Sequence, residues 1–189
     1  MKKFELTTES ITFLGRTLFR IKALISFGNV KAGELGGYIE KEGNLSHEGN
    51  AWVCGNAEVY GDAEVCDNAR VCGNAWVCGN ARVYGDAEVC GNARVYGDAE
   101  VCGDAWVCGN AEVYGDADIA TISGFGSEYR TTTFFRTKNN EIAVKRGCFY
   151  GTLAEFREKV KETHGDNRYA KEYLMIADLM EMHFRGEEE

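Results

Sequence analysis

Five basic residues gather near the C-terminal end of an otherwise acidic chain. They are Arg130, Arg136, Lys138, Lys145 and Arg146. Between residues 121 and 151 they are opposed only by Glu128 and Glu141, so five positive and two negative charges leave a net +3. Guanidinium and ammonium groups bind phosphates and carboxylates through charge-assisted hydrogen bonds. We expect this segment to bind a phosphate-containing small ligand or a protein partner; the alternative is that it docks on acidic residues of its own chain.

Three tryptophans form a second candidate site. Trp52, Trp76 and Trp106 alternate with small apolar residues, so an extended backbone would direct their side chains away from a core. Exposed indole rings commonly mark contact surfaces. We expect them to contact a protein partner or to join copies of this chain in a homo-oligomer, a trimer being one form.

The cysteines recur at one position of a short repeat. Seven of the eight lie there, and tyrosine occupies the same position in other copies. A position shared by Cys and Tyr indicates packing rather than a disulfide framework. An alternative is a soft-metal site made by thiolates, but we expect no metal and no other cofactor. Because stacked cysteines can bridge when oxidised, this interpretation places the protein in a reducing cytoplasm.

A six-residue phrase is repeated twelve times between residues 49 and 120. It reads Gly, Asn or Asp, Ala, a variable residue, Val, then Cys or Tyr. Ala and Val lie two apart and share one face of an extended strand, while Gly-Asn or Gly-Asp favours a turn. Three such units fit a triangular coil of eighteen residues, and four coils stack into a rod.

Stacking would bring residues eighteen positions apart into contact. The expected neighbours are complementary in charge or shape, which supports this register independently of the apolar pattern. They form an amide ladder, a charge column, an aromatic and charged column, and a thiol column. These contain Asn56, Asn74, Asn92 and Asn110; Glu64, Arg82, Glu100 and Asp118; Trp76, Arg94 and Glu112; and Cys54, Cys72, Cys90 and Cys108.

The repeat resembles the hexapeptide repeat of left-handed parallel β-helices. The segments 27–40 and 44–53, which read Phe-Gly-Asn-Val-Lys-Ala-Gly-Glu-Leu-Gly-Gly-Tyr-Ile-Glu and Asn-Leu-Ser-His-Glu-Gly-Asn-Ala-Trp-Val, are similar to the entry segment of YdcK-like bacterial and phage proteins. Those proteins have no established reaction. The resemblance covers residues 15–120, and it implies a mainly β fold with a left-handed solenoid.

The same resemblance raises acyl transfer, because many left-handed β-helices are acyltransferases that use a histidine. The regular repeats contain no histidine, and His47 lies just before them. An acyltransferase-like enzyme with sites between subunits is therefore an alternative hypothesis, with His47 as its base. We expect a protein that is not an enzyme.

The flanks of the repeat must cover its two ends. The sequence predicts an N-terminal β cap over 1–36, the β-helix over 37–120, and a β-hairpin with two helices over 121–189. Expected strands cover 4–6, 11–14, 17–27, 131–136 and 141–150; expected helices cover 153–164 and 167–185, and residues 187–189 are expected to fray.

Charge and composition restrict the functional classes. The repeat carries twelve acidic residues and three arginines, a net −9, whereas the flanks carry eighteen charges of each sign. Such a rod is not expected to bind nucleic acid directly, although an acidic mimic of nucleic acid is a further alternative. No membrane span or secretory signal is visible. We expect a cytoplasmic, phage- or prophage-encoded binding or scaffold protein that binds a host protein or a small anionic ligand.

Overall fold

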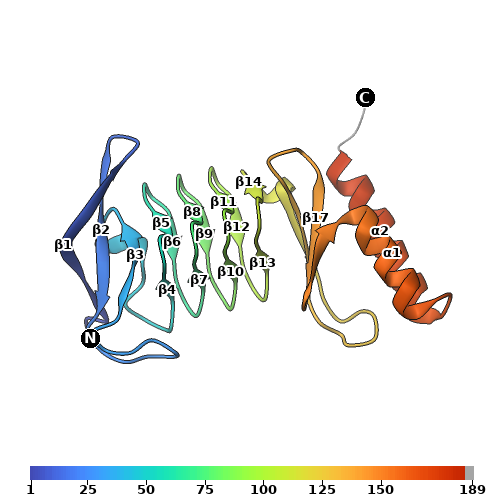
Figure 1. Ribbon diagram of the computed structural model, residues 1–189, viewed down its shortest axis with the longest axis horizontal. Coiled ribbons are helices and arrows are strands. Elements are labelled where there is room, and N and C mark those ends of the chain that lie inside the picture. The colour runs from blue at the N-terminus through green and yellow to red at the C-terminus, as the bar shows by residue number, and fades with distance from the viewer. Residues whose placement is uncertain (186–189) are drawn as a thin grey trace.

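The structure, a computed structural model, describes residues 1–185. Short strands stack along the middle of the molecule, an antiparallel sheet lies at one end, and another sheet with two helices lies at the other (Figure 1). The fold is therefore mainly β, with a solenoid of parallel sheets at its centre, as the repeat predicts.

Eleven of the twelve repeat units each contribute one strand of two residues to the solenoid. These strands are β4 (Trp52–Val53), β5 (Glu58–Val59), β6 (Glu64–Val65), β7 (Arg70–Val71), β8 (Trp76–Val77), β9 (Arg82–Val83), β10 (Glu88–Val89), β11 (Arg94–Val95), β12 (Glu100–Val101), β13 (Trp106–Val107) and β14 (Glu112–Val113). Every third strand pairs in parallel, in the orders β5-β8-β11-β14, β4-β7-β10-β13 and β6-β9-β12. Three units per coil are thereby confirmed.

The expected columns are present, except that Asp118 lies in a 3-10 turn and pairs with Arg136 and so does not extend the charge column beyond Glu100. Arg94 lies opposite both Trp76 and Glu112 in the parallel register. Its guanidinium stacks 4.4 Å from the Trp76 ring and pairs with Glu112 at 3.1 Å. The amide ladder from Asn56 through Asn74 has hydrogen bonds of 3.4 Å. Stacking therefore follows the eighteen-residue register.

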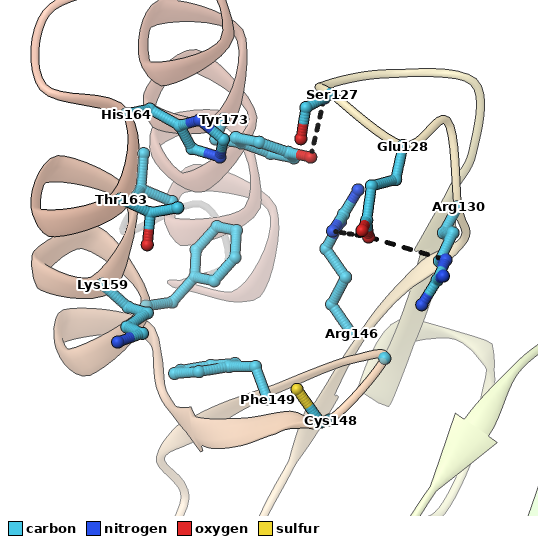
Figure 2. A pocket seen from close by; sticks show the side chains of 13 residues that line it. Ser127, Glu128, Arg130, Arg146, Cys148, Phe149, Lys159, Thr163, His164 and Tyr173 are labelled. Carbon is cyan, nitrogen blue, oxygen red and sulfur yellow. Dashed lines mark hydrogen bonds and ion pairs between the residues drawn. The ribbon is translucent and has the colours of Figure 1, made fainter.

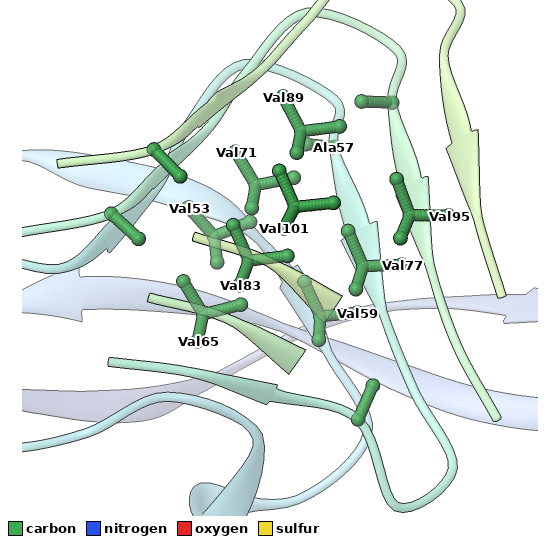
Figure 3. Close-up of a cluster of buried hydrophobic side chains, with 14 of the residues drawn as sticks. Val53, Ala57, Val59, Val65, Val71, Val77, Val83, Val89, Val95 and Val101 are labelled. Atoms are coloured by element: carbon green, nitrogen blue, oxygen red, sulfur yellow. The ribbon is translucent and has the colours of Figure 1, made fainter. Parts of the chain in front are cut away.

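The core of the solenoid is a column of Ala and Val side chains. Those in β5 to β14 and the turns between them are 0 or 1% exposed, and Figure 3 shows the valines converging from the three faces. The corners depend on glycine, because Gly73 has φ +74° and an added Cβ would lie 3.1 Å from the backbone nitrogen of Gly91. Asp67 takes the corner position of glycine once, with φ 58°, and its carboxylate accepts the N–H of Gly85 at 3.1 Å.

The hydrogen bonds between coils that involve a turn residue run in one direction, from the earlier coil to the later one, whereas within the paired strands the valine N–H donates in the opposite direction. The N–H of Trp52 donates to the carbonyl of Ala69 in the next coil, and the N–H of Arg94 donates to that of Ala111. The first coil therefore presents mostly carbonyl groups to whatever precedes it, and the last coil presents mostly N–H groups to whatever follows. Unpaired backbone groups of this kind must be satisfied when they are buried.

The N-terminal cap consists of β1 (Phe4–Phe13), β2 (Arg16–Ala23) and β3 (Leu35–Ile39), with a short 3-10 turn η1 (Glu42–Asn44). The two strands expected over 4–6 and 11–14 are one strand, interrupted by a register shift between Leu6 and Ser10. β3 pairs antiparallel with β2 and parallel with β5, so the cap continues one face of the solenoid.

The C-terminal unit holds a four-stranded antiparallel sheet where a hairpin was expected. Its elements are η2 (Asp116–Asp118), β15 (Ile119–Ile122), β16 (Thr132–Arg136), β17 (Ile142–Arg146), β18 (Phe149–Thr152), α1 (Leu153–His164) and α2 (Arg168–Arg185). Phe135 and Ala143 pack into the solenoid core, whereas Phe134 and Val144 pack with the helices. The sheet is thus a partition between the last coil and the two helices.

Both helices begin and end close to the expected positions. Thr152 caps α1, accepting the N–H of Glu155 at 3.2 Å while the Glu155 carboxylate accepts the N–H of Thr152 at 2.7 Å. The expectation for residues 187–189 lies outside the described residues. Within residues 1–185, neither helix combines the length and apolar character needed to cross a membrane.

Candidate functional site

The five basic residues do not form one patch, because successive residues of a strand point to opposite faces. In β17, Lys145 faces the solenoid and Arg146 faces the helices. Lys145 is only 7% exposed, and its Nζ atom lies 3.7 Å from the centroid of the Trp106 ring. It also donates to the carbonyl of Gly147 at 2.5 Å. Lys145 therefore holds the sheet to the last coil.

Arg136 is engaged within the chain as well. Its guanidinium pairs with Asp118 at 3.0 Å, donates to Asn140 Oδ1 at 2.8 Å and reaches the carbonyl of Phe184 near the end of α2. This is the expected alternative in which a basic residue of the tail docks on an acidic residue of the repeat. Lys138 lies elsewhere, in a shallow groove beside the amide ladder at Asn92 and Asn110.

Arg130 and Arg146 do come together, in a cavity of about 270 Å³ in the C-terminal unit. The loop that precedes β16, the β17–β18 turn and α1 form its walls, and Tyr173 of α2 closes one side (Figure 2). The loop is fixed to α2, because Ser127 donates its N–H to the Tyr173 hydroxyl at 3.2 Å and Gly126 donates to Glu172 at 2.9 Å. We take this cavity as the candidate site and call it the tail cavity.

Arg146 is the most buried cation of the tail cavity. Its side chain is 13% exposed, and the guanidinium stacks 4.8 Å from the Tyr173 ring. One terminal nitrogen donates to Glu128 at 3.4 Å. The Nε atom and the other terminal nitrogen are buried, and neither has a hydrogen-bond partner within residues 1–185. Leaving buried donors unpaired costs about 1–3 kcal/mol each.

The other charges of the tail cavity leave it positive. Arg130 pairs with Glu128 at 3.5 Å, and its side chain is 61% exposed. Lys159 reaches the cavity from α1, so Arg130, Arg146 and Lys159 against Glu128 give a formal charge of +2. Lys159 also pairs with Glu162, outside the cavity, at 2.7 Å. An anion entering here would meet two guanidinium groups and an ammonium group.

Sequence reasoning missed the helical side of the tail cavity. This side is formed by Lys159, Thr163 and His164 of α1. The centroids of the His164 and Tyr173 rings are 5.6 Å apart. The signal was weak: Lys159 and Thr163 are four residues apart and so share a helix face beside the apolar Val160. Nothing in the sequence says that this face meets the loop carrying Arg130.

The expectation of three exposed indoles is wrong. Trp52 is 1% exposed and packs edge-on against Phe27 at 5.4 Å. Trp76 is half-buried between Phe13 and the guanidinium of Arg94, and Trp106 is half-buried beneath Lys145. The two flanks fold over the rings that a bare solenoid would expose.

His47 is held at both ring nitrogens. Its Nδ1 atom accepts the backbone N–H of Lys3 at 3.2 Å, so Nε2 carries the proton and donates it to Glu42 at 3.0 Å. The ring also stacks on Phe4, with 4.3 Å between centroids. No lone pair is left to accept a proton from a substrate, so this arrangement gives the acyltransferase alternative no support.

The cysteine column departs from the packing role expected for it. Cys54 and Cys72 form a disulfide between adjacent coils, with their Cα atoms 4.7 Å apart. The reason is the stacking itself, which places these Cα atoms within the range that a disulfide spans. Cys66, Cys78, Cys90, Cys102, Cys108 and Cys148 are free thiols.

The comparisons with known proteins concern the repeat. The family model of the YdcK Beta solenoid repeat matches residues 63–79, 75–91 and 87–103. No curated protein matches the chain. The tail cavity lies outside the matched residues. Residues 63–103 are therefore YdcK-type beta solenoid repeats, which confirms for this segment the resemblance drawn from the sequence.

Proposed function

We propose that this protein is a non-catalytic binding protein whose tail cavity takes a small ligand with a phosphate group. The solenoid is the rigid support that holds the C-terminal unit. One observation carries the proposal: two guanidinium nitrogens of Arg146 are buried and unpaired within the described residues, in a cavity of net positive charge.

The unpaired nitrogens form one edge of the guanidinium group. Nε and the terminal nitrogen beside it present two parallel N–H bonds, the fork that recognises phosphate or carboxylate in a bidentate manner. Glu128 contacts the other terminal nitrogen and leaves this fork unused. A phosphate would supply the acceptors that the fork lacks.

Glu128 is the internal competitor of such a ligand. It contacts Arg146 at 3.4 Å and Arg130 at 3.5 Å, beyond the roughly 2.7–2.9 Å of strong charge-assisted bonds. Its carboxylate is also half exposed, so returning it to water costs little. A dianionic ligand can therefore displace Glu128 and draw both arginines toward itself.

The wider setting remains part of the proposal. A phage or prophage origin, a host-protein partner and a homo-oligomer rest on the resemblance and on composition. The cytoplasmic location rests on the packing interpretation of the cysteines, which the disulfide between Cys54 and Cys72 counts against. Two alternatives also stay predictions. An acyltransferase requires binding of coenzyme A and an activity that is lost in His47→Ala. An acidic mimic requires salt-sensitive binding to a nucleic-acid-handling protein.

Calorimetric titration with inorganic phosphate and with phenyl phosphate tests the proposal. We expect saturable binding at one site, weakened tenfold or more in Arg146→Lys, which keeps the charge but loses the fork. Glu128→Gln should bind more tightly, because it removes the competing carboxylate. Lys138→Gln is the matched control, since it removes one charge from the separate groove by the amide ladder.

Two results would overturn the proposal. One is the absence of saturable binding to wild-type protein. The other is binding that Lys138→Gln weakens as much as Arg146→Lys does, because general attraction to positive charge would then explain it. Circular dichroism spectra that match wild type establish that each variant is folded.

A further inference from the structure

Cys90 and Cys108 occupy adjacent coils in the same column as the bonded pair. Val89 and Val107 are register partners, and the N–H of Cys90 donates to the carbonyl of Val107 at 2.9 Å. The same relation holds where Cys54 donates its N–H to Val71 at 2.8 Å, beside the disulfide. The backbone therefore aligns Cys90 with Cys108 as it aligns the two bonded cysteines.

The surroundings of Cys90 favour its thiolate. The indole N–H of Trp106 donates to Sγ of Cys90 at 3.2 Å, and the ammonium of Lys145 lies over that indole ring. The pKa of Cys90 falls to about 6, chiefly because the Cys108 thiol donates to it. The Trp106 indole and, to a smaller extent, Lys145 add to the effect, while burial and the carboxylate of Glu88 oppose it. The same hydrogen bond raises the pKa of Cys108.

We propose that Cys90 and Cys108 are a reactive dithiol that exchanges with low-molecular-weight disulfides, Cys90 being the attacking thiol and Cys108 the resolving thiol. This site spans the last two coils, on the opposite side of the C-terminal sheet from the tail cavity. It is independent of the proposed ligand binding.

The exchange balances in two steps. The Cys90 thiolate attacks one sulfur of the small disulfide, forming a mixed disulfide and releasing one small thiolate, which takes the proton of Cys108. The Cys108 thiolate then attacks Sγ of Cys90 and releases the second small thiolate. The small disulfide is reduced to two thiols while the two cysteines are oxidised to one disulfide.

Three other repeat cysteines provide internal controls, because none has a cysteine one coil away. Cys78 lies between Tyr60 and Tyr96, and Cys66 and Cys102 both neighbour Tyr84 in the column. Burial raises the pKa of Cys66, the opposite direction from Cys90. These thiols lack both a resolving partner and the combination of indole and ammonium found at Cys90.

The test is oxidation by glutathione disulfide, followed by blocking of free thiols, unfolding, trypsin digestion and mass spectrometry. Cleavage after Arg70, Arg82 and Arg94 places Cys90 alone in peptide 83–94, and Cys108 with Cys102 in peptide 95–130. We expect a disulfide between these two peptides that persists in Cys102→Ala. Cys108→Ser should stop the reaction at a mixed disulfide with glutathione on Cys90, and Cys90→Ser should give neither product.

Lys145→Met should slow the modification of Cys90 severalfold, measured against the modification of Cys78 in the same sample. The proposal is overturned if Cys66 or Cys78 reacts as fast as Cys90, or if peptide 71–82, which contains Cys72 and Cys78, links to 83–94, which would mean that Cys90 pairs with a cysteine other than Cys108. It also fails if Cys108→Ser accumulates no mixed disulfide while its circular dichroism spectrum matches wild type.

Discussion

The backbone N–H of Trp106 donates to the side-chain oxygen of Thr133 at 3.0 Å. In earlier coils the equivalent N–H finds a carbonyl of the next coil, as that of Glu88 finds Ala105. The hydroxyl oxygen of Thr133 therefore takes the place of the carbonyl that a further coil would provide. Asp116 and Asp118 do the same for the N–H groups of Glu100 and Tyr114. Acceptors thus cover the end of the solenoid that presents donors.

The opposite end presents carbonyl groups, and donors cover it. The Nζ atom of Lys3 lies 2.9 Å from the carbonyl oxygen of Ala51 and 3.3 Å from that of Glu48. The amide of Asn44 donates to Ala63 at 2.8 Å. The direction of hydrogen bonding along the solenoid therefore decides which chemistry each cap needs.

A first prediction concerns the charge of Lys3. Burial lowers its pKa from 10.5 to about 8, so between these values the unfolded chain binds more protons than the folded one. Stability should therefore rise with pH across this window, relative to Lys3→Met, which lacks the titrating group. Urea unfolding of both proteins from below pH 8 to pH 10.5 measures it. If the free energies of unfolding of the two proteins changed in parallel with pH, the prediction would be contradicted. The thiols and tyrosines that also titrate in this range are the same in both proteins, so their contributions cancel in the difference.

A second prediction concerns the contact between the C-terminal sheet and the solenoid. Lys145→Met removes a buried cation–π contact and a hydrogen bond to the carbonyl of Gly147, so we expect the free energy of unfolding to fall by about 1–3 kcal/mol. Lys138→Met, at an exposed position, should change it by less than about 0.5 kcal/mol. Equal effects would show that Lys145 has no special role in this contact.

The solenoid could be predicted in detail because its information is local and repeated. Twelve copies fix the inward Ala and Val, the corner glycines and the eighteen-residue register. The ladder from Asn56 and the stacking of Arg94 on Trp76 follow directly from that register. The pairing of Cys54 with Cys72 was permitted by the same geometry, but the packing interpretation set it aside.

The tail cavity could not be predicted in the same way. Its charges come from a loop, a strand and a helix, and contacts between such elements have no period in the sequence. In the sequence, Arg136, Lys145 and Arg146 are simply three positive charges. In the fold, side chains alternate between the two faces of the sheet, so Lys145 contacts the solenoid whereas Arg146 contacts the helices. The burial of Trp52 likewise depends on Phe27, which reaches it from the N-terminal cap.

A third prediction concerns the corners of the solenoid. Gly73→Ala puts a Cβ at φ +74° and 3.1 Å from the backbone of the next coil, so we expect a loss of at least about 1 kcal/mol of stability. Gly43→Ala is the matched control, because an added Cβ there meets no atom within 4 Å and φ is not positive. Gly73→Ala should have a lower midpoint of thermal unfolding than Gly43→Ala. Equal midpoints would mean that a side chain at the corner position costs no stability.

The last prediction concerns Arg136, which the sequence offered as a ligand-binding residue. The side chains of Arg136 and Asp118 are 26% and 21% exposed, and the same guanidinium reaches Asn140 and the carbonyl of Phe184. One planar group therefore joins the end of the solenoid, the hairpin turn and α2. Arg136→Lys keeps the charge but cannot make these contacts together.

We expect Arg136→Lys to cost about 1–3 kcal/mol and to accelerate amide hydrogen exchange in α2 more than in β8. Asp118→Asn should have a smaller effect, because Asn140 and Phe184 still hold the guanidinium group. Phosphate binding should be unchanged in Arg136→Lys, since Arg136 does not line the tail cavity. If Arg136→Lys showed wild-type amide hydrogen exchange but no longer bound phosphate, Arg136 would be a ligand-binding residue. The ligand would then have to lie outside the tail cavity.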